Sequence, residues 1–531
     1  MHARPLPASP WLLIIAYCLV WALVHGLSQP NLDAYHDMLE NFAWSQTWAW
    51  GTFKHPPLFA WVVKLWFSVA PQTTLSYKLL AYLNVAAGLA GVAWLARLLG
   101  LAVFGRTAVL LLLWSLPYTT LAAKFNANSI LLSLWPWTAA AWLASVQRRG
   151  GRGLAASVLL GVLAAACVLS KYFSGVLLLG LLLAALLSAD GRRWLLGARS
   201  WLALAVFAVG LAPHALWLLT HDFPTLRYAM EQGGGDTQWR YVAKFALAPL
   251  FYWAPAWLAC VSVFAWSAPR QRVGTWLRLA VASWRAQSAQ DTLFWLAALP
   301  GGITLIFGLF GVAELSTPWA IPIGFAFPLL WLRNLAHATA PPPGNRDNAV
   351  TPAPRTARGL AALQRAAWPV LAAVVAAGGV LAVTQARQGE QRYYAPTEEA
   401  ARAMAAGWRE RHPDVPLGWT GGQWADNALV AFYVSGRIRA LPGLPDQWPA
   451  TLTPHPTWAQ EGGLLICPHG PVTKDATART ACEQQAEDWL HGHGHAVLRH
   501  RLEAARSGWR FPHPVPHAYV VYDVLPASTS P

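Results

Sequence analysis

The chain has 531 residues, of which 55% are hydrophobic and only 12% are charged, with a mean hydropathy of +0.34. Soluble domains carry about 25% charged residues, so this composition excludes a soluble protein and indicates a polytopic α-helical membrane protein. The net charge of +15 comes from arginines in short clusters between apolar segments. That pattern is typical of cytoplasmic loops, and it argues against a nucleic-acid-binding surface.

Apolar segments long enough to cross a bilayer, about 20 residues each, recur along most of the chain. Eleven are predicted: 11–27, 76–99, 106–122, 128–146, 154–169, 172–188, 200–219, 242–266, 292–312, 318–335 and 366–385. One broken helix over 154–188 is the alternative to the closely spaced fifth and sixth segments. Residues 58–70 are apolar but shorter, which favours a re-entrant or interfacial helix. No small-residue cleavage site follows the first apolar segment, so we expect an uncleaved first helix.

The arginines predict the orientation of these segments. With a cytoplasmic N-terminus, every second loop is rich in arginine, as the positive-inside rule requires. These arginines are Arg97, Arg106, Arg148, Arg149, Arg152, Arg192, Arg193, Arg199, Arg270, Arg272, Arg278, Arg285, Arg333, Arg346, Arg355, Arg358 and Arg365. The opposite loops hold most of the acids: Asp33, Asp37, Glu40, Asp222, Glu231, Asp236 and Glu314. Eleven spans then place the C-terminus outside a bacterial inner membrane, in the periplasm.

Two domains are expected from the change in composition along the chain. Residues 1–385 form the transmembrane domain, with an outer loop and interfacial helices over 28–75 and a Pro- and Arg-rich cytoplasmic linker over 336–365. Residues 386–531 have the composition of a soluble domain. A helix over 397–411 and an alternating strand over 517–524 predict a small α/β domain of about 140 residues.

The first outer loop, residues 31–58, carries an unusual set of side chains. Asp33, Asp37 and Glu40 stand at spacings of 4 and 3, which on a helix share one face. A carboxylate there is suited to act as a general base on an acceptor hydroxyl or amine. A solvated helix face at the membrane surface is the alternative.

A rigid corner, Lys54-His55-Pro56-Pro57, follows in the same loop. Proline fixes its own φ and holds the preceding residue extended, so the side chains before it are held in place. Lys54 is then suited to a lipid phosphate as a point charge. A lysine that snorkels to the membrane interface is the alternative.

Five cysteines are present. Cys18, Cys167 and Cys260 lie in apolar runs and are expected to be small core residues. Cys467 and Cys482 lie in the polar C-terminal region. A disulfide between these two is expected if that region is periplasmic, and two free thiols are the alternative.

The first-loop motif W-x-W-G-x-F-K-H-P-P-L-F-A-W resembles that of the bacterial family 39 glycosyltransferases of the GT-C class. This family is related to the protein O-mannosyltransferases and the lipid A aminoarabinose transferases. Weaker elements follow in the family's order: Ser170-Lys171-Tyr172, Thr220-His221-Asp222-Phe223-Pro224, Gly311-Val312-Ala313-Glu314, and Gly421-Gly422-Gln423-Trp424-Ala425-Asp426-Asn427.

The resemblance implies an integral membrane glycosyltransferase that uses a polyprenyl-phosphate sugar and a lipid, polysaccharide or protein acceptor. Counted from His55-Pro56, the family's usual Asp-Glu pair falls on Asp37 and Met38, so the second acid is missing at its usual place. Asp37 is therefore the expected base, with Asp33 as its alternative and Glu40 as a further substitute for the missing acid.

The leaving phosphate requires positive charge. For this role the resemblance implies cations held at Lys54, His55, Lys171, Arg227 and Arg240. Lys171 stands between apolar segments, where a lysine is costly unless it is partnered or functional.

Further candidates for substrate contacts are polar residues in the outer loops. These are Glu40, Lys124, Asn126, His221, Asp222 and Glu314. Helix capping is the alternative for Asn126 and its neighbour Asn128, and a structural ion pair is the alternative for Glu314.

No cofactor is indicated by the sequence. The tract His491, His493, His495 and His500 lacks the regular spacing of a zinc site and is expected to be solvent-exposed. A divalent cation on Asp33 and Asp37 is the remaining metal hypothesis.

Two functions from other classes compete with the transferase. A transporter or flippase for lipid-linked sugars predicts polar residues deep within several helices and inverted repeats, and the sequence shows little of either. A non-catalytic assembly protein leaves the acidic loop without a role.

Overall fold

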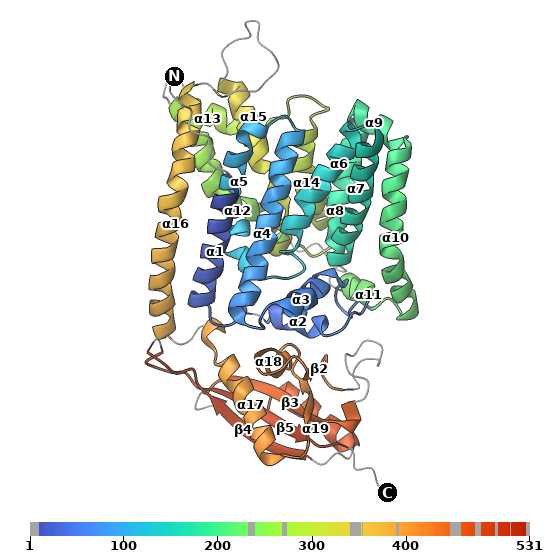
Figure 1. Ribbon diagram of the computed structural model, residues 1–531, viewed down its shortest axis with the longest axis vertical. Coiled ribbons are helices and arrows are strands. Elements are labelled where there is room, and N and C mark those ends of the chain that lie inside the picture. The colour runs from blue at the N-terminus through green and yellow to red at the C-terminus, as the bar shows by residue number, and fades with distance from the viewer. Residues whose placement is uncertain are drawn as a thin grey trace, which may run out of the picture. The chain divides into compact units, whose positions relative to one another are not determined.

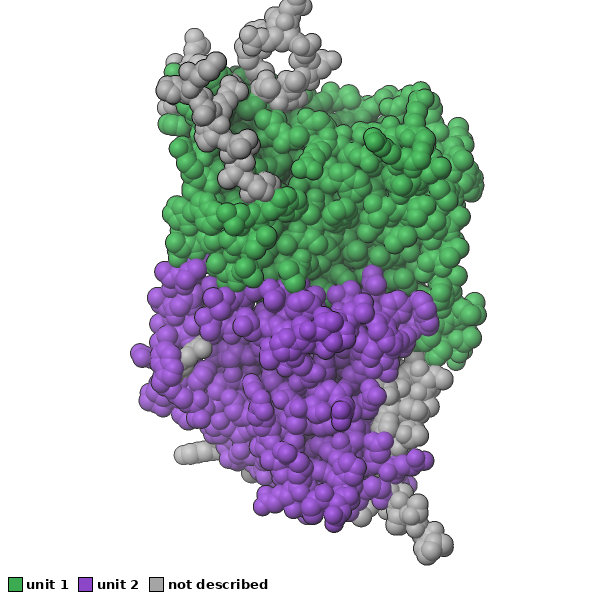
Figure 2. All heavy atoms as spheres, in the orientation of Figure 1, with its two compact units in different colours: residues 1–21, 54–56, 81–373 green, residues 22–53, 57–80, 374–531 purple. Residues whose placement is uncertain are grey.

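The computed structural model describes residues 10–34, 36–231, 239–267, 273–339, 352, 354–388, 392–445, 458–472, 479–493, 497–509 and 511–526. Asp236, Arg270, Arg272, Arg346 and His495 lie outside the described residues, as does much of the expected linker. The chain divides into two compact units (Figure 2), each considered by itself below. Unit 1 comprises residues 1–21, 54–56 and 81–373, and unit 2 comprises residues 22–53, 57–80 and 374–531.

Unit 1 consists of apolar helices that run alongside one another (Figure 1). Its helices are α5 (Gly105–Leu113), α6 (Leu131–Gln147), α7 (Gly150–Ser170), α8 (Gly175–Leu187), α9 (Ala189–Leu195), α10 (Ala198–Thr220), α11 (Pro224–Glu231), α12 (Trp239–Ser267), α13 (Val273–Ala282), α14 (Thr292–Leu309) and α15 (Phe327–Thr339). Its 3-10 turns are η1 (Ala102–Phe104), η2 (Leu116–Tyr118), η3 (Leu121–Ala123), η4 (Tyr172–Ser174), η5 (Thr317–Ala320) and η6 (Ile323–Ala326). The helices α1 (Pro10–Ser28), α4 (Thr74–Leu98) and α16 (Pro354–Gln388) have residues in both units.

The chain is a multi-pass membrane protein. Among the described residues, eight helices are long and apolar enough to span a bilayer, and up to ten if each of two bent helix pairs is one span. These account for eight to ten of the eleven expected spans. The predicted span 106–122 is bent by 83° between residues 113 and 116, and 172–188 is followed by a bend of 112° after Leu187. The predicted span 128–146 forms α6, which has only 17 residues.

Small side chains allow the helices of unit 1 to pack closely. Helices α7 and α10 lie against each other, and Gly161 stands where they cross. A Cβ at Gly161 would lie 2.5 Å from the carbonyl oxygen of Ala203. Any larger residue at Gly161 would therefore push these helices apart.

Unit 2 contains a five-stranded sheet with the order β2-β1-β3-β5-β4. The strands are β1 (Leu417–Gly422), β2 (Arg439–Ala440), β3 (Gly462–Pro471), β4 (Val497–Ala504) and β5 (His517–Val524). The helices of this unit are α2 (Asp37–Ser45), α3 (Leu58–Val69), α17 (Thr397–Arg411), α18 (Ala428–Tyr433) and α19 (Ala481–His493), with 3-10 turns η7 (Arg392–Tyr394) and η9 (Trp458–Gln460). Strand β1 runs parallel to β2 and β3, whereas β5 is antiparallel to β3 and β4. We call residues 392–526 of this unit the sheet domain.

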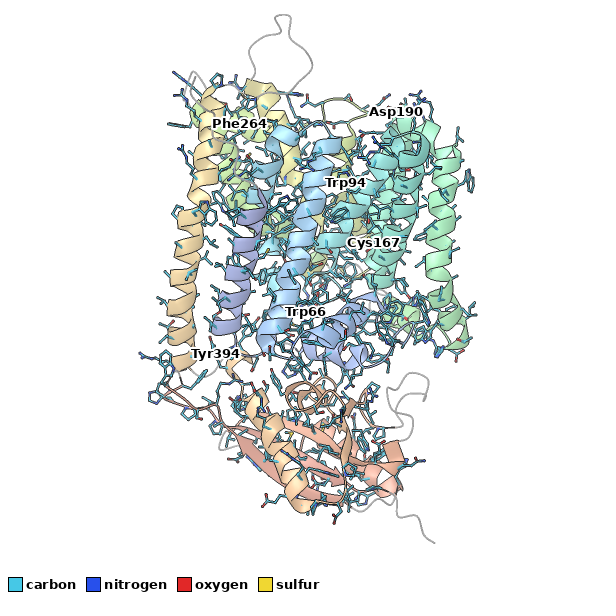
Figure 3. All side chains as sticks on the ribbon, viewed as in Figure 1. Trp66, Trp94, Cys167, Asp190, Phe264 and Tyr394 are labelled. Carbon is cyan, nitrogen blue, oxygen red and sulfur yellow. A yellow bond between two sulfur atoms is a disulfide. The ribbon has the colours of Figure 1, made fainter. Side chains whose placement is uncertain are left out.

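The core of the sheet domain lies between the sheet and α19. Trp419, Leu465 and Tyr522 from three adjacent strands pack there with Trp489 of α19. A disulfide joins Cys467 of β3 to Cys482 of α19, with a Cα–Cα distance of 5.6 Å. Of the other cysteines, Cys18, Cys167 and Cys260 are buried; Cys167, labelled in Figure 3, lies among the helices of unit 1.

Replacing both Cys467 and Cys482 with alanine is expected to destabilise the sheet domain by about 3 kcal/mol, because the bond closes a loop of 15 residues. Hydrogen exchange of β3 amides in the detergent-solubilised full chain measures this loss. A reductant should produce the same loss in the wild type and none in the double variant. Equal exchange in the oxidised wild type and the double variant would contradict the prediction.

Candidate active site

The acidic loop of unit 2 folds as the short helix α2, whose start is capped by Asp33. The two carboxylate oxygens of Asp33 accept hydrogen bonds from the backbone N–H groups of Asp37 (3.2 Å) and Met38 (2.7 Å). Such a cap satisfies N–H groups that lack partners within the helix. Asp33 therefore lies outside the helix, and the prediction that all three acids share one helical face is wrong for this residue.

Glu40 and Asp37 have different surroundings. Glu40 is buried, and its carboxylate accepts a hydrogen bond from the indole N–H of Trp424 at 2.5 Å. The rings of Trp44 and Phe53 pack against Trp424, with centroids 5.8 and 5.5 Å away. Asp37 is half-buried and is the first residue of α2, where the helix dipole favours an acidic side chain.

Two further side chains fix this loop. Lys78 of α4 is 1% exposed, and its ammonium donates a hydrogen bond to the backbone carbonyl of Leu32. A buried ammonium needs such a partner. Met38 is fully buried in the apolar core. An acid at that position would be buried as well, which is costly without a partner.

Unit 1 gathers Lys54, His55 and Lys171, which we call the cationic cluster. The ammonium of Lys54 lies 5.8 Å from the ring centroid of Tyr228, and the His55 ring meets the same ring edge-on at 6.2 Å. The ammonium of Lys171 donates a hydrogen bond to the side-chain oxygen of Asn128 at 2.6 Å and lies 5.8 Å from the Trp319 ring centroid. Cations are attracted to ring faces at this range.

His55 does not carry the charge that the sequence suggested. Burial, together with the nearby ammonium groups of Lys171 and Lys54, holds the pKa of His55 well below its ordinary value of 6.5. This direction favours the neutral imidazole, which contradicts the prediction that His55 is a cation. The positive charge of the cluster belongs to the two lysines.

The pH–rate profile of the protein is expected to show no change of slope near pH 6.5 that is due to titration of His55. Because its pKa is lowered in the folded state, His55 stays neutral through this range, and it lowers the stability only as the pH falls below about 6.5. The pH–rate profiles of the wild type and of His55→Gln should therefore keep the same shape between pH 6 and 8. A break near pH 6.5 that is lost in His55→Gln would contradict this.

The His221-Asp222-Phe223-Pro224 turn leads into α11, the helix that carries Tyr228. Asp222 and Phe223 have φ values of 57° and 56°, and α11 begins at Pro224 directly after them. The guanidinium of Arg227 donates to the Asp222 carbonyl oxygen through Nε at 2.6 Å, and His221 stacks on Trp217 at 4.6 Å. Arg227, expected to bind phosphate, thus closes the turn, and the carboxylate of Asp222 is 91% exposed.

The remaining candidates lie in several loops and at helix ends of unit 1. The side-chain oxygen of Asn126 accepts hydrogen bonds from the backbone N–H groups of Asn128 and Ser129. This is the helix-capping role that was the alternative to a substrate contact. Arg240 stacks on Tyr241. Lys124 is half-buried and Glu314 is exposed. In the part of the chain that the structure describes, no group of three or more His, Cys, Asp or Glu side chains could hold a metal ion.

Comparisons with known proteins agree with this architecture. Residues 54–217 match the family described as dolichyl-phosphate-mannose-protein mannosyltransferase. The lipid A galacturonosyltransferase RgtD of Rhizobium johnstonii is 25% identical over 349 residues, which cover 59% of this chain and 71% of the relative.

Solved structures of ArnT from Cupriavidus metallidurans share the fold. The structure bound to undecaprenyl phosphate matches with a TM-score of 0.54 and 15% identity, over 97% of this chain and 98% of ArnT. The apo structure matches with a TM-score of 0.51 and 16% identity, over 96% and 97%. The resemblance to the GT-C glycosyltransferases is confirmed.

Several residues of the candidate site were not predicted from the sequence. Lys78 was a detectable signal, because a lysine inside an apolar helix is costly unless it is partnered. Tyr228 and Trp319 had no such signal, since single aromatic residues near a membrane interface are ordinary. The bond from Trp424 to Glu40 joins residues 384 positions apart, and no local pattern reports a contact of that kind.

Proposed function

We propose that this protein transfers a sugar from a polyprenyl-phosphate donor to a lipid, polysaccharide or protein acceptor on the periplasmic face of the inner membrane. The cationic cluster is the observation that carries the proposal. The ammonium groups of Lys54 and Lys171 both lower the pKa of the half-buried imidazole of His55, so two positive charges lie near one ring. Concentrated ammonium charge of this kind is suited to a phosphate. The named activity of RgtD and the undecaprenyl phosphate bound to ArnT support this choice.

The reaction that fits these residues is a single displacement at the sugar carbon. Asp37 accepts the proton of the acceptor hydroxyl or amine as the oxygen or nitrogen forms its bond to that carbon. The bond from the carbon to the phosphate oxygen breaks, and the polyprenyl phosphate departs with the electron pair. Lys54 and Lys171 offset the charge that grows on the phosphate, and neutral His55 donates a hydrogen bond there. Lys124, Asn128 and Glu314 are proposed to contact the sugar.

The proposed topology keeps the N-terminus in the cytoplasm and the sheet domain in the periplasm. It requires an odd number of spans. The two bent pairs bring the number to ten, and α6, whose 17 residues are at the lower limit for a span, supplies the eleventh. The arginine-rich loops support this orientation. We propose functional domains at 1–385, which performs the transfer, and 386–531. The cytoplasmic linker expected at 336–365 is shorter than predicted, because α15 extends to Thr339 and α16 begins at Pro354.

A deletion strain tests the function whichever sugar is transferred. Mass spectrometry of its lipids and envelope glycans should reveal the loss of one sugar and the accumulation of its polyprenyl-phosphate donor. The wild type and Asp190→Ala should restore the sugar, whereas Asp37→Ala should not, at equal protein level. Asp190 is a suitable control because its side chain is 75% exposed on α9, at the end of unit 1 (Figure 3).

Two outcomes would overturn the proposal. Restored glycan in both Asp37→Ala and Asp33→Ala would show that neither carboxylate takes part in catalysis. A transporter of lipid-linked sugars would instead move the donor across the membrane of proteoliposomes without breaking its phosphate–sugar bond.

A further inference from the structure

The turn that follows β1 in the sheet domain has an unusual backbone. Gly422 and Ala425 have φ values of 102° and 72°, a region that a residue with a Cβ rarely adopts. The turn is nevertheless held firmly. The N–H groups of Gly422 and Gln423 donate to the carbonyl oxygens of Gly443 and Ile466, each at 2.9 Å.

This turn presents two side chains to the start of α2. The indole of Trp424 donates to the carboxylate of Glu40 at 2.5 Å, and the carboxylate of Asp426 lies 3.1 Å from Nδ1 of His36. His36 has a φ of 63° and directly precedes α2, and its carbonyl oxygen accepts a hydrogen bond from the Glu40 N–H at 2.9 Å. Open α/β sheets bind ligands beyond the carboxyl ends of their parallel strands. In this protein, the turn at the carboxyl end of β1 contacts α2 of the same chain.

The other end of α2 is also attached to the sheet domain. The side-chain amide of Gln46 donates to the Ile438 carbonyl oxygen at 2.7 Å and accepts from the Ala440 N–H at 2.9 Å. In the middle of the helix, Phe42 meets Phe432 edge-on with ring centroids 5.2 Å apart. The helix is thereby restrained along its whole length.

We propose that Trp424 and Asp426 are positioning residues, which fix the rotation of α2 and thus the position of the Asp37 carboxylate. This inference rests on the proposed function, which assigns Asp37 as the base. A side chain extends about 5–6 Å from a helix axis, so a rotation of about 10° moves its end by roughly 1 Å. A displacement of about 1 Å can slow a reaction by about 10²-fold. Ala425 holds the strained turn that aims both side chains at one helix.

Trp424→Phe and Asp426→Asn test this in the full-length protein reconstituted in nanodiscs. The first keeps an aromatic ring but removes the N–H donor, and the second removes the charge that faces His36. Each is expected to lower kcat for transfer from the polyprenyl-phosphate donor by about 10–100-fold, while KM for the donor changes less than about twofold. Hydrogen exchange of the α2 amides should become faster. Trp509→Phe and Asp414→Asn, which alter exposed residues of the same domain, should change neither quantity.

A double-variant comparison shows whether Trp424 acts through Glu40. The pair Glu40→Gln with Trp424→Phe should be no slower than Glu40→Gln alone. The positioning role would be overturned if the losses of kcat in the two single variants multiplied in the double variant. It would also be overturned by an unchanged kcat in both Trp424→Phe and Asp426→Asn, or by a large increase in their KM for the donor. If the wild type transfers no sugar, the proposed function fails, and unchanged exchange of α2 in the variants would overturn the positioning role separately.

Discussion

Asp37→Asn is expected to lower kcat for sugar transfer by about 10²–10⁴-fold, which is the usual contribution of a general base. The amide has almost the same size as the carboxylate but cannot accept the acceptor's proton. Asp37 is half-buried at the start of α2, and its backbone N–H donates a hydrogen bond to Asp33, which asparagine keeps. The fold should therefore tolerate the change. Initial rates in proteoliposomes, at equal protein level, give the measurement.

Asp33→Ala provides the contrast that separates catalysis from structure. Loss of a helix cap costs about 0.5–2 kcal/mol, so this variant should show faster hydrogen exchange at the start of α2. Its kcat should fall less than that of Asp37→Asn, and Asp190→Asn should match the wild type. If Asp33→Asn abolishes transfer while Asp37→Asn keeps it, the two roles are reversed.

Lys171→Gln is expected to lower kcat/KM for the polyprenyl-phosphate donor by about 10²–10³-fold. This is the usual effect of removing one group that stabilises developing negative charge. Glutamine still offers an N–H to Asn128 but carries no charge, so the fold should persist. Lys171→Arg keeps the charge with a different shape and should give an intermediate rate.

Lys244→Gln is a matched control for this loss of charge. Lys244 also lies over an aromatic ring, 5.7 Å from the Tyr241 centroid, but it is exposed and outside the cationic cluster. Its removal should leave kcat/KM unchanged, and binding of undecaprenyl phosphate should weaken only in Lys171→Gln. Equal losses of kcat/KM in both variants would show that removing any positive charge near the membrane has this effect.

Local sequence patterns predicted where the membrane helices lie better than they predicted where these helices bend. Apolar runs marked almost every membrane helix, because a bilayer demands about 20 apolar residues wherever a helix crosses it. The same runs did not show that 106–122 bends by 83°. Such a bend depends on how the flanking turns pack, and hydropathy alone contains no information on packing.

The roles of charged residues depended still more on the tertiary structure. The sequence indicated that the acids and lysines of the loops matter, since charge beside a membrane is costly without a purpose. Only the fold showed that Asp33 caps a helix and that Arg227 closes a turn. It also showed that burial beside two lysines lowers the pKa of His55.

The sequence by itself determined the membrane class and the resemblance to the GT-C glycosyltransferases, and it drew attention to residues 31–58. Composition and short motifs are local properties, so they can be read without a structure. The tertiary structure alone decided how the three acids differ. Glu40 meets Trp424 and His36 meets Asp426 across almost 400 residues of chain, and such partners are set by how distant segments pack, which no local pattern encodes.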